Sequence, residues 1–163
     1  MYHVLISNSH RTQSGQCSIT FDIDDTLIFD SETEVPNIHI KRLLDMCILY
    51  KYDVHLITAR EKSDAITEWT RSQLRRHKIE YMSLSLAPST HRTSMKKISE
   101  WKHATRNKFP NLILTVGDQW GDLIKLGKES DIQALDELHC SKHKWLLIQT
   151  AVGVYGLKTM AQK

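Results

Sequence analysis

Residues 18–27 read SITFDIDDTL, and this stretch decides the fold. Its β-branched and aromatic residues are typical of a buried strand, and carboxylates follow directly on the apolar run. Because side chains of an extended chain alternate in direction, we expect Asp22 and Asp24 to lean to the same side. Two neighbouring carboxylates repel each other unless a cation or a shared proton relieves them. An acidic loop that caps a helix is the alternative, but the pattern favours a cation site at a strand end.

The rest of the chain alternates strands with helices. Further apolar runs that predict strands lie at residues 54–57, 81–86, 112–116 and 145–148. Helical patterns run over residues 36–50, with Pro36 in the first turn, from Ser63 or Asp64, from Ser94, and over about 120–126. This order predicts an α/β fold, a three-layer α/β/α sandwich around a central, mostly parallel sheet. We expect a single domain over residues 1–163, with residues 1–15 as an arm or edge strand.

The composition is ordinary for one soluble globular domain of 163 residues, with 40% hydrophobic and 25% charged residues. Six Gly and three Pro exclude a linker-rich or disordered chain. No apolar run approaches the roughly 20 residues of a membrane span, so we expect no membrane association. Three widely spaced Cys, and opening residues without a secretion signal, predict a cytoplasmic protein. His139, Cys140 and His143 offer three metal ligands where a structural zinc needs four, so a surface loop is favoured there.

The charge of the chain is unevenly distributed. Residues 60–108 carry twelve Lys and Arg against five Asp and Glu, although the net charge of the whole chain is only +3. A basic middle segment suits an anionic substrate, or it is simply the solvated face of a helix. Nucleic acid is therefore a partner that charge alone supports weakly.

Two other predicted strands also end in residues with oxygen-bearing side chains. The second ends at Thr58, and the fourth runs into Gly117, followed by Asp118 and Asp122. The carboxyl ends of parallel strands meet at one edge of the sheet, where such folds bind their ligands. Carboxylate and hydroxyl oxygens at that edge suit Mg²⁺ and phosphate. The sequence therefore predicts a magnesium and phosphate site.

These motifs resemble those of the haloacid dehalogenase (HAD) superfamily of phosphohydrolases. Its first motif, D-x-D-x-[TV]-[LV], is matched by DIDDTL at residues 22–27, and its second by Thr58 at the end of an apolar strand. Its fourth motif, such as G-D-x-x-x-D, is matched by residues 117–122. Within the superfamily, GDQWGDL preceded by Lys102-x-x-x-Arg106 is similar to the acid-phosphatase-like branch. The resemblance covers about residues 17–127 and implies the HAD-like Rossmannoid version of the predicted sandwich.

The resemblance implies a Mg²⁺-dependent phosphatase that hydrolyses phosphomonoesters through an aspartyl-phosphate. Asp22 is then the nucleophile, while Asp24 protonates the leaving alkoxide and later activates water. Thr58 and Lys102 hold the phosphoryl oxygens on which transition-state charge gathers. The metal ligands that it implies are Asp22, Asp24 through its backbone carbonyl, Asp118 and Asp122, the last of which alternatively supports the lysine.

Three lysines compete for the third motif of the family, namely Lys96, Lys97 and Lys102. We favour Lys102, because the family's Lys-x-x-x-Arg spacing is met there by Arg106, and Lys97 comes second. On one helix, Lys97 and Lys102 point about 140° apart, so they cannot both face the site. We also expect Arg60 and Arg106 to bind the substrate.

The spacing of the motifs leaves no room for a cap domain. Thr58 follows Asp24 by 34 positions and Lys102 follows Thr58 by 44, and core elements fill both intervals. An open site accepts a large phosphorylated substrate, or is covered by a second subunit of a homo-oligomer. The alternatives are therefore a nucleic-acid 3′-phosphatase or a phosphoprotein phosphatase of the same fold and, in another class, a non-catalytic binding module.

Overall fold

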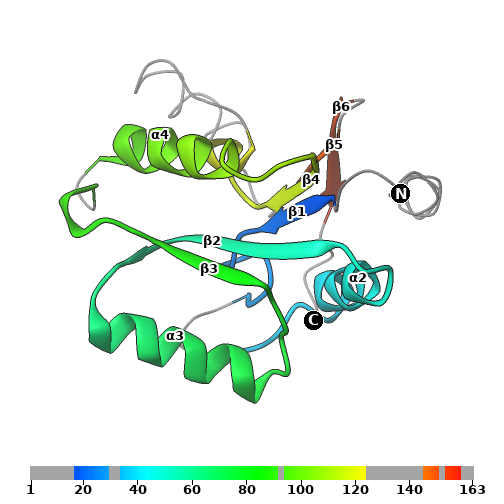
Figure 1. Cartoon of the computed structure of the whole chain (residues 1–163), viewed down its shortest axis with the longest axis horizontal. Coiled ribbons are helices and arrows are strands. Elements are labelled where there is room, and N and C mark those ends of the chain that lie inside the picture. The colour runs from blue at the N-terminus through cyan, green and yellow to red at the C-terminus, as the bar shows by residue number, and fades with distance from the viewer. Residues whose placement is uncertain (1–16, 30–33, 92–93, 124–144, 151–152, 159–163) are drawn as a thin grey trace.

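The fold is a six-stranded sheet with helices packed on it (Figure 1). The computed structural model describes residues 17–29, 34–91, 94–123, 145–150 and 153–158. The strands are β1 (Ser18–Phe21), β2 (Asp53–Glu61), β3 (Ser83–Ala87), β4 (Leu112–Gly117), β5 (Trp145–Thr150) and β6 (Gly153–Lys158). Their order is β3-β2-β1-β4-β5-β6; β1 to β4 run parallel, while β5 and β6 each run antiparallel to the strand before.

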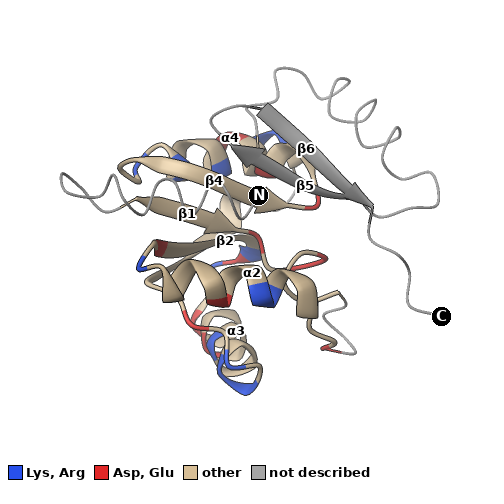
Figure 2. Ribbon diagram, turned by 90° about the vertical axis from the view of Figure 1, so that its right-hand side faces the viewer, with Lys and Arg blue, Asp and Glu red and all other residues tan. Residues whose placement is uncertain are grey.

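The predicted α/β architecture is confirmed. The helices are α2 (Ile38–Leu49), α3 (Asp64–Arg76) and α4 (Met95–Arg106), with short 3₁₀ turns η1 (Ser89–His91) and η2 (Trp120–Asp122). Helix α4 covers one face of the sheet, and α2 and α3 lie on the other (Figures 1 and 2). An apolar run predicted β5 but not its direction. Strand β6 was not predicted, because it contains two glycines, which are poor strand formers.

Strand β1 lies in the centre of the sheet, and its four residues are all buried. Its last residue, Phe21, pairs with Leu56 of β2 and with Val116 of β4. On the same strands, Thr20 donates a hydrogen bond of 3.0 Å to Thr115. These contacts hold the carboxyl ends of β1, β2 and β4 side by side, which positions whatever follows each strand.

Side-chain caps define where the three helices begin. Asn37 Oδ1 accepts a hydrogen bond of 3.4 Å from the backbone N–H of Ile40, so Asn37 is the N-cap of α2. The prediction that Pro36 lies in the first turn is therefore wrong: Pro36 precedes the cap and forms an isolated bridge with Ile28. Ser63, rather than Asp64, caps α3, and Ser94 caps α4 as predicted.

Several expectations fall outside the described residues. These are the arm at residues 1–15, the cluster of His139, Cys140 and His143, and the second half of the helix expected at 120–126. The first half of that helix is the 3₁₀ turn η2, which is shorter and tighter than an α-helix. Among the helices of the described ranges, none is long and apolar enough to cross a membrane.

The cap of α4 leads to a stability prediction. Ser94 Oγ accepts a hydrogen bond of 3.3 Å from the Lys97 N–H, and Ser94→Ala should lower the free energy of unfolding by about 1 kcal/mol. Urea denaturation measures this, with Ser94→Asp expected to retain most of the stability. The control is Ser72→Ala inside α3, where alanine is the better helix former and no loss is expected. An equal loss in both variants would contradict the capping role.

Candidate active site

The carboxyl ends of β1, β2 and β4 bring the predicted acidic residues together. Asp22 follows β1 directly, and its N–H donates to the carbonyl of Val116 at 2.9 Å. Asp118 follows β4, and Asp122 ends η2, which packs against α4. One carboxylate oxygen from each of these three aspartates lies within 4.8 Å of the others. The first and fourth motifs, almost a hundred residues apart, therefore form one cluster.

Lys102 of α4 occupies the centre of this cluster. Its Nζ donates to Asp22 Oδ1 at 3.0 Å and also to Asp122 Oδ1. Lys102 is only 5% exposed, so its charge is compensated by carboxylates rather than by water. Three carboxylates lie near two buried cations, the ammonium group of Lys102 and the guanidinium of Arg106, which leaves an excess of negative charge.

That excess appears in the acidity of the groups. Burial raises the pKa of Asp22 well above its usual value, the charge of Lys102 lowers it, and Asp122 and Asp118 raise it further. Burial, with the neighbouring charge of Asp122, raises the pKa of Asp118 to about 7. Burial alone would lower the pKa of Lys102, but Asp122 and Asp22 outweigh it, so this pKa is raised. A divalent cation would favour the ionised carboxylates and relieve their repulsion.

Asp122 mainly holds its neighbours in place. One of its oxygens accepts from Lys102, and the other accepts from the Gln119 N–H at 3.0 Å. A side chain at Gly117 would collide with the side chain of Asp122, so glycine is required for this close approach. Thr26 of the first motif donates to Asp118 Oδ1 at 3.4 Å and joins the two acidic loops.

Asp24 has a different set of partners. Arg60 donates to it from Nε at 2.9 Å and from Nη2 at 2.6 Å, and Thr58 donates at 3.4 Å. The register of β2 against β3 shifts between Thr58 and Glu61, and such irregularities redirect side chains. The Arg60 side chain is 7% exposed and that of Asp24 38%, so the carboxylate faces the open side.

Sequence reasoning missed the residues that hold Arg60. Its Nη1 donates to Thr70 at 3.2 Å, and its guanidinium lies 4.5 Å from the centre of the Trp69 ring. Trp69, Thr70 and Leu74 all belong to α3. Thr70 and Leu74 are fully buried, but Trp69 is 38% exposed. The sequence offered one signal for this contact. Trp69 lies in the helix that follows the second strand and its basic residue, Arg60.

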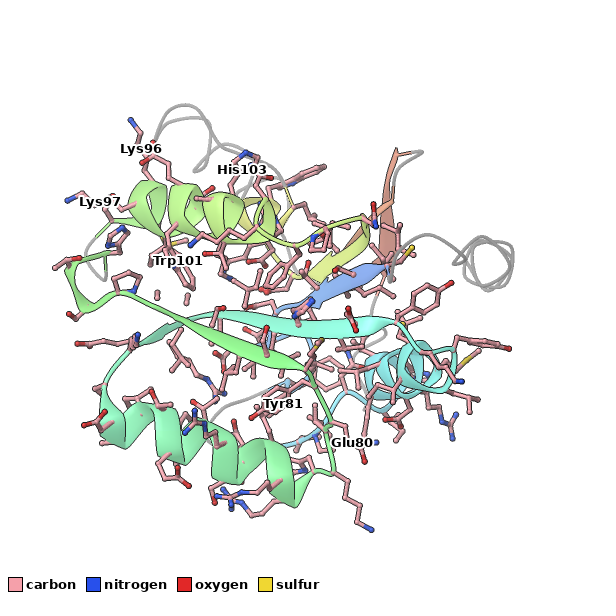
Figure 3. The ribbon with its side chains drawn as sticks, viewed as in Figure 1. Glu80, Tyr81, Lys96, Lys97, Trp101 and His103 are labelled. Carbon is pink, nitrogen blue, oxygen red and sulfur yellow. The ribbon has the colours of Figure 1, made fainter. Side chains whose placement is uncertain are left out.

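The other predicted lysines lie elsewhere, whereas Arg106 is buried beside the acidic cluster and lines the same small pocket as Asp22, Lys102 and Asp122. Lys96 and Lys97 are at the start of α4 and point away from the sheet (Figure 3). Lys102, in contrast, donates to Asp22 at the end of β1. Arg106 is 4% exposed, and its Nη1 donates to the carbonyl of Gly121 at 3.3 Å. Burial lowers the pKa of Arg106 to about 10, although Asp122 and Asp22 oppose this. The structure thus places Arg106 against the backbone of η2, and its expected contact with substrate stays a prediction.

Comparisons with known proteins show the fold only. No protein-family model matches the chain, and no curated protein is detectably similar to it. Two solved structures, of a Pnkp1/Rnl/Hen1 complex and of the Pnkp1/Rnl/Hen1 RNA repair complex, resemble it with a TM-score of 0.50 and 20% identity. The match covers 61% of this chain and 37% or 34% of the other chain, so this chain spans about a third of those proteins' length.

The crowded carboxylates lead to a prediction about metal-free protein. Asp118→Asn removes a half-buried negative charge that lies close to Asp22 and Asp122, so it should raise the melting temperature in the presence of EDTA. Because the pKa of Asp118 is raised to about 7, ionisation costs stability above the usual pKa of an aspartate. The gain should therefore grow between about pH 4 and pH 7 and stay constant above.

Thermal melts with and without Mg²⁺ complete this test. Mg²⁺ should stabilise the wild type by mass action, and this effect should disappear in Asp118→Asn. Asp45→Asn is the control, since Asp45 is a surface residue paired with Lys41. If Mg²⁺ stabilises Asp118→Asn as much as the wild type, the acidic cluster is not the metal site.

Proposed function

We propose that this chain is a Mg²⁺-dependent phosphatase of the HAD type, which hydrolyses phosphomonoesters through an aspartyl-phosphate. One observation carries the proposal: Asp22, at the end of the central strand, shares Lys102 with Asp122 and lies within 4.8 Å of Asp118. A nucleophilic carboxylate, a fixed cation and a further carboxylate then meet at one point. The similarity in fold to a solved RNA repair complex is consistent with the proposal.

The donor set fits Mg²⁺, because it consists of hard carboxylate oxygens that carry excess negative charge. Asp22 and Asp118 would hold the ion, with the backbone carbonyl of Asp24 as the further ligand that the family implies. Asp122 supports this set from behind, since its two oxygens already accept from Lys102 and Gln119. When bound, Mg²⁺ neutralises charge between the anionic nucleophile and the anionic substrate.

The residues of the chain then divide the reaction between them. Asp22 attacks phosphorus and forms an aspartyl-phosphate, which splits one difficult displacement into two easier ones. Lys102, oriented by Asp122, stabilises the charge that develops on the phosphoryl oxygens. Asp24 protonates the leaving alkoxide in the first step and takes a proton from water in the second.

Thr58 and Arg60 both donate to Asp24. Thr58 also serves the phosphoryl oxygens, as the family implies. Arg60 donates in a forked geometry, which fixes the Asp24 carboxylate. We expect Arg60 to keep this contact and to meet the substrate on the leaving-group side.

The nucleophile gives the first test. Asp22→Asn should abolish hydrolysis of p-nitrophenyl phosphate in the presence of Mg²⁺, because an amide cannot attack phosphorus. Circular dichroism and a thermal melt check that the variant is folded. Activity at the wild-type level in a purified, folded Asp22→Asn protein would disprove the proposed mechanism and favour a non-catalytic binding module or another site.

The lysine gives the second test. Lys102→Ala should lower the rate about 10²–10³-fold, because it removes a charge aimed at the transition state. Lys97→Ala is the matched control on the same helix, and its exposed charge should change the rate only a few-fold. A crippled Lys97→Ala beside an active Lys102→Ala would reassign the phosphate-binding lysine.

The macromolecular alternative, a nucleic-acid 3′-phosphatase, is supported only by the fold similarity and the basic middle segment. To test it, kcat/KM is measured with three substrates: an oligoribonucleotide with a 3′-phosphate, the same strand with a 5′-phosphate, and a phosphopeptide. A preference for the 3′-phosphate supports the nucleic-acid phosphatase, and a preference for the phosphopeptide supports a phosphoprotein phosphatase.

A further inference from the structure

An exposed tryptophan contacts the arginine that binds Asp24, the acid that would serve the leaving group. Trp69 is 38% exposed, whereas its neighbour Thr70 is fully buried. The Trp69 ring stacks against the guanidinium of Arg60, and Arg60 in turn donates two hydrogen bonds to Asp24. Trp69 is thus linked to Asp24 through a single side chain.

We propose that Trp69, with Arg60, forms a subsite that stacks a planar aromatic ring on the leaving-group side of the substrate, such as a nucleobase. This inference rests on the proposed phosphatase function, because the position of Asp24 defines the leaving-group side. The occupant is identified by its chemistry: a flat ring carried on the alcohol that is released.

The subsite is held in place by three contacts to Arg60. Asp24 accepts from its Nε and Nη2, Thr70 accepts from its Nη1 at 3.2 Å, and the Trp69 ring lies 4.5 Å away. A guanidinium with its hydrogen bonds satisfied restrains the indole through a cation–π contact. The ring therefore needs little ordering when a ligand binds, which favours affinity.

Position and chemistry together select the ligand. In the proposed mechanism the leaving oxygen meets Asp24, and the proposed subsite places the group attached to that oxygen along Arg60 and Trp69. An indole gains stacking energy from an aromatic ring but not from a small aliphatic alcohol. A nucleoside phosphate places its base several bonds from the leaving oxygen, as this arrangement requires, whereas the ring of an aryl phosphate is bonded to that oxygen.

The experiment compares substrates with and without a ring. For wild type and Trp69→Ala, kcat/KM is measured with adenosine 3′-monophosphate, adenosine 5′-monophosphate, phenyl phosphate and glycerol 2-phosphate. Trp69→Ala should lower the value for at least one nucleotide about tenfold more than the value for glycerol 2-phosphate. Trp69→Phe should restore most of the difference. Leu49→Ala removes an exposed apolar side chain at the far end of α2 and should leave all four values unchanged.

The pattern of losses decides between interpretations. A selective loss with phenyl phosphate but not with the nucleotides assigns the subsite to aryl phosphates rather than to nucleobases. An equal loss with every substrate overturns the subsite, because Trp69 would then only position Arg60. No loss with any substrate overturns it as well.

Binding separates this inference from the proposed function. Adenosine 3′-monophosphate and adenosine 5′-monophosphate are titrated by calorimetry into Asp22→Asn protein and into the double variant with Trp69→Ala. If the wild type hydrolyses none of the four substrates, the proposed function fails for them. The subsite still stands if a nucleotide binds Asp22→Asn about tenfold more tightly than it binds the double variant, and it falls if the two affinities are equal.

Discussion

The ammonium group of Lys102 is the element on which the rest of the structure depends. It is buried, and it donates to carboxylates that come from two distant segments, Asp22 after β1 and Asp122 in η2. Removing Lys102 would leave the buried carboxylates of Asp22 and Asp122 without their shared ammonium partner, which is costly. The position of α4 on the sheet, the tight exit after β4 at Gly117 and the turn of η2 all serve this contact.

The same cluster is not balanced in charge. Three aspartates lie near two cations, Lys102 and Arg106, and the raised pKa values of Asp22 and Asp118 reflect burial and mutual repulsion. This imbalance separates the site from an ordinary buried ion pair, in which charges cancel. A metal-dependent site requires such an excess of negative charge, because the bound ion supplies the balancing positive charge.

The two carboxylates of the first motif have partners that are anchored to opposite layers of the sandwich, since α4 and α3 lie on opposite faces of the sheet (Figure 1). Asp22 is contacted by Lys102 of α4, whereas Asp24 is contacted by Arg60 of β2, which Thr70 and Trp69 of α3 hold in place. Residues 22 and 24 are close in sequence but differ in environment, one enclosed and one open. Distinct environments allow two carboxylates to take distinct roles, a nucleophile and a proton carrier.

The sequence by itself determined the parallel α/β core, because buried strands read as apolar runs and capping residues such as Ser94 mark helix starts. It also located Asp22, Asp24, Thr58, Asp118 and Asp122 at or just after strand ends, and the Lys-x-x-x-Arg spacing of the resembling family favoured Lys102 over Lys97. Only the tertiary structure decided that Arg60 binds Asp24, that Trp69 is exposed beside it, and that Arg106 faces the backbone of η2. These contacts join residues that are distant in sequence, or they depend on a local shift in strand register. Neither a distant contact nor a register shift leaves a periodic pattern in the chain.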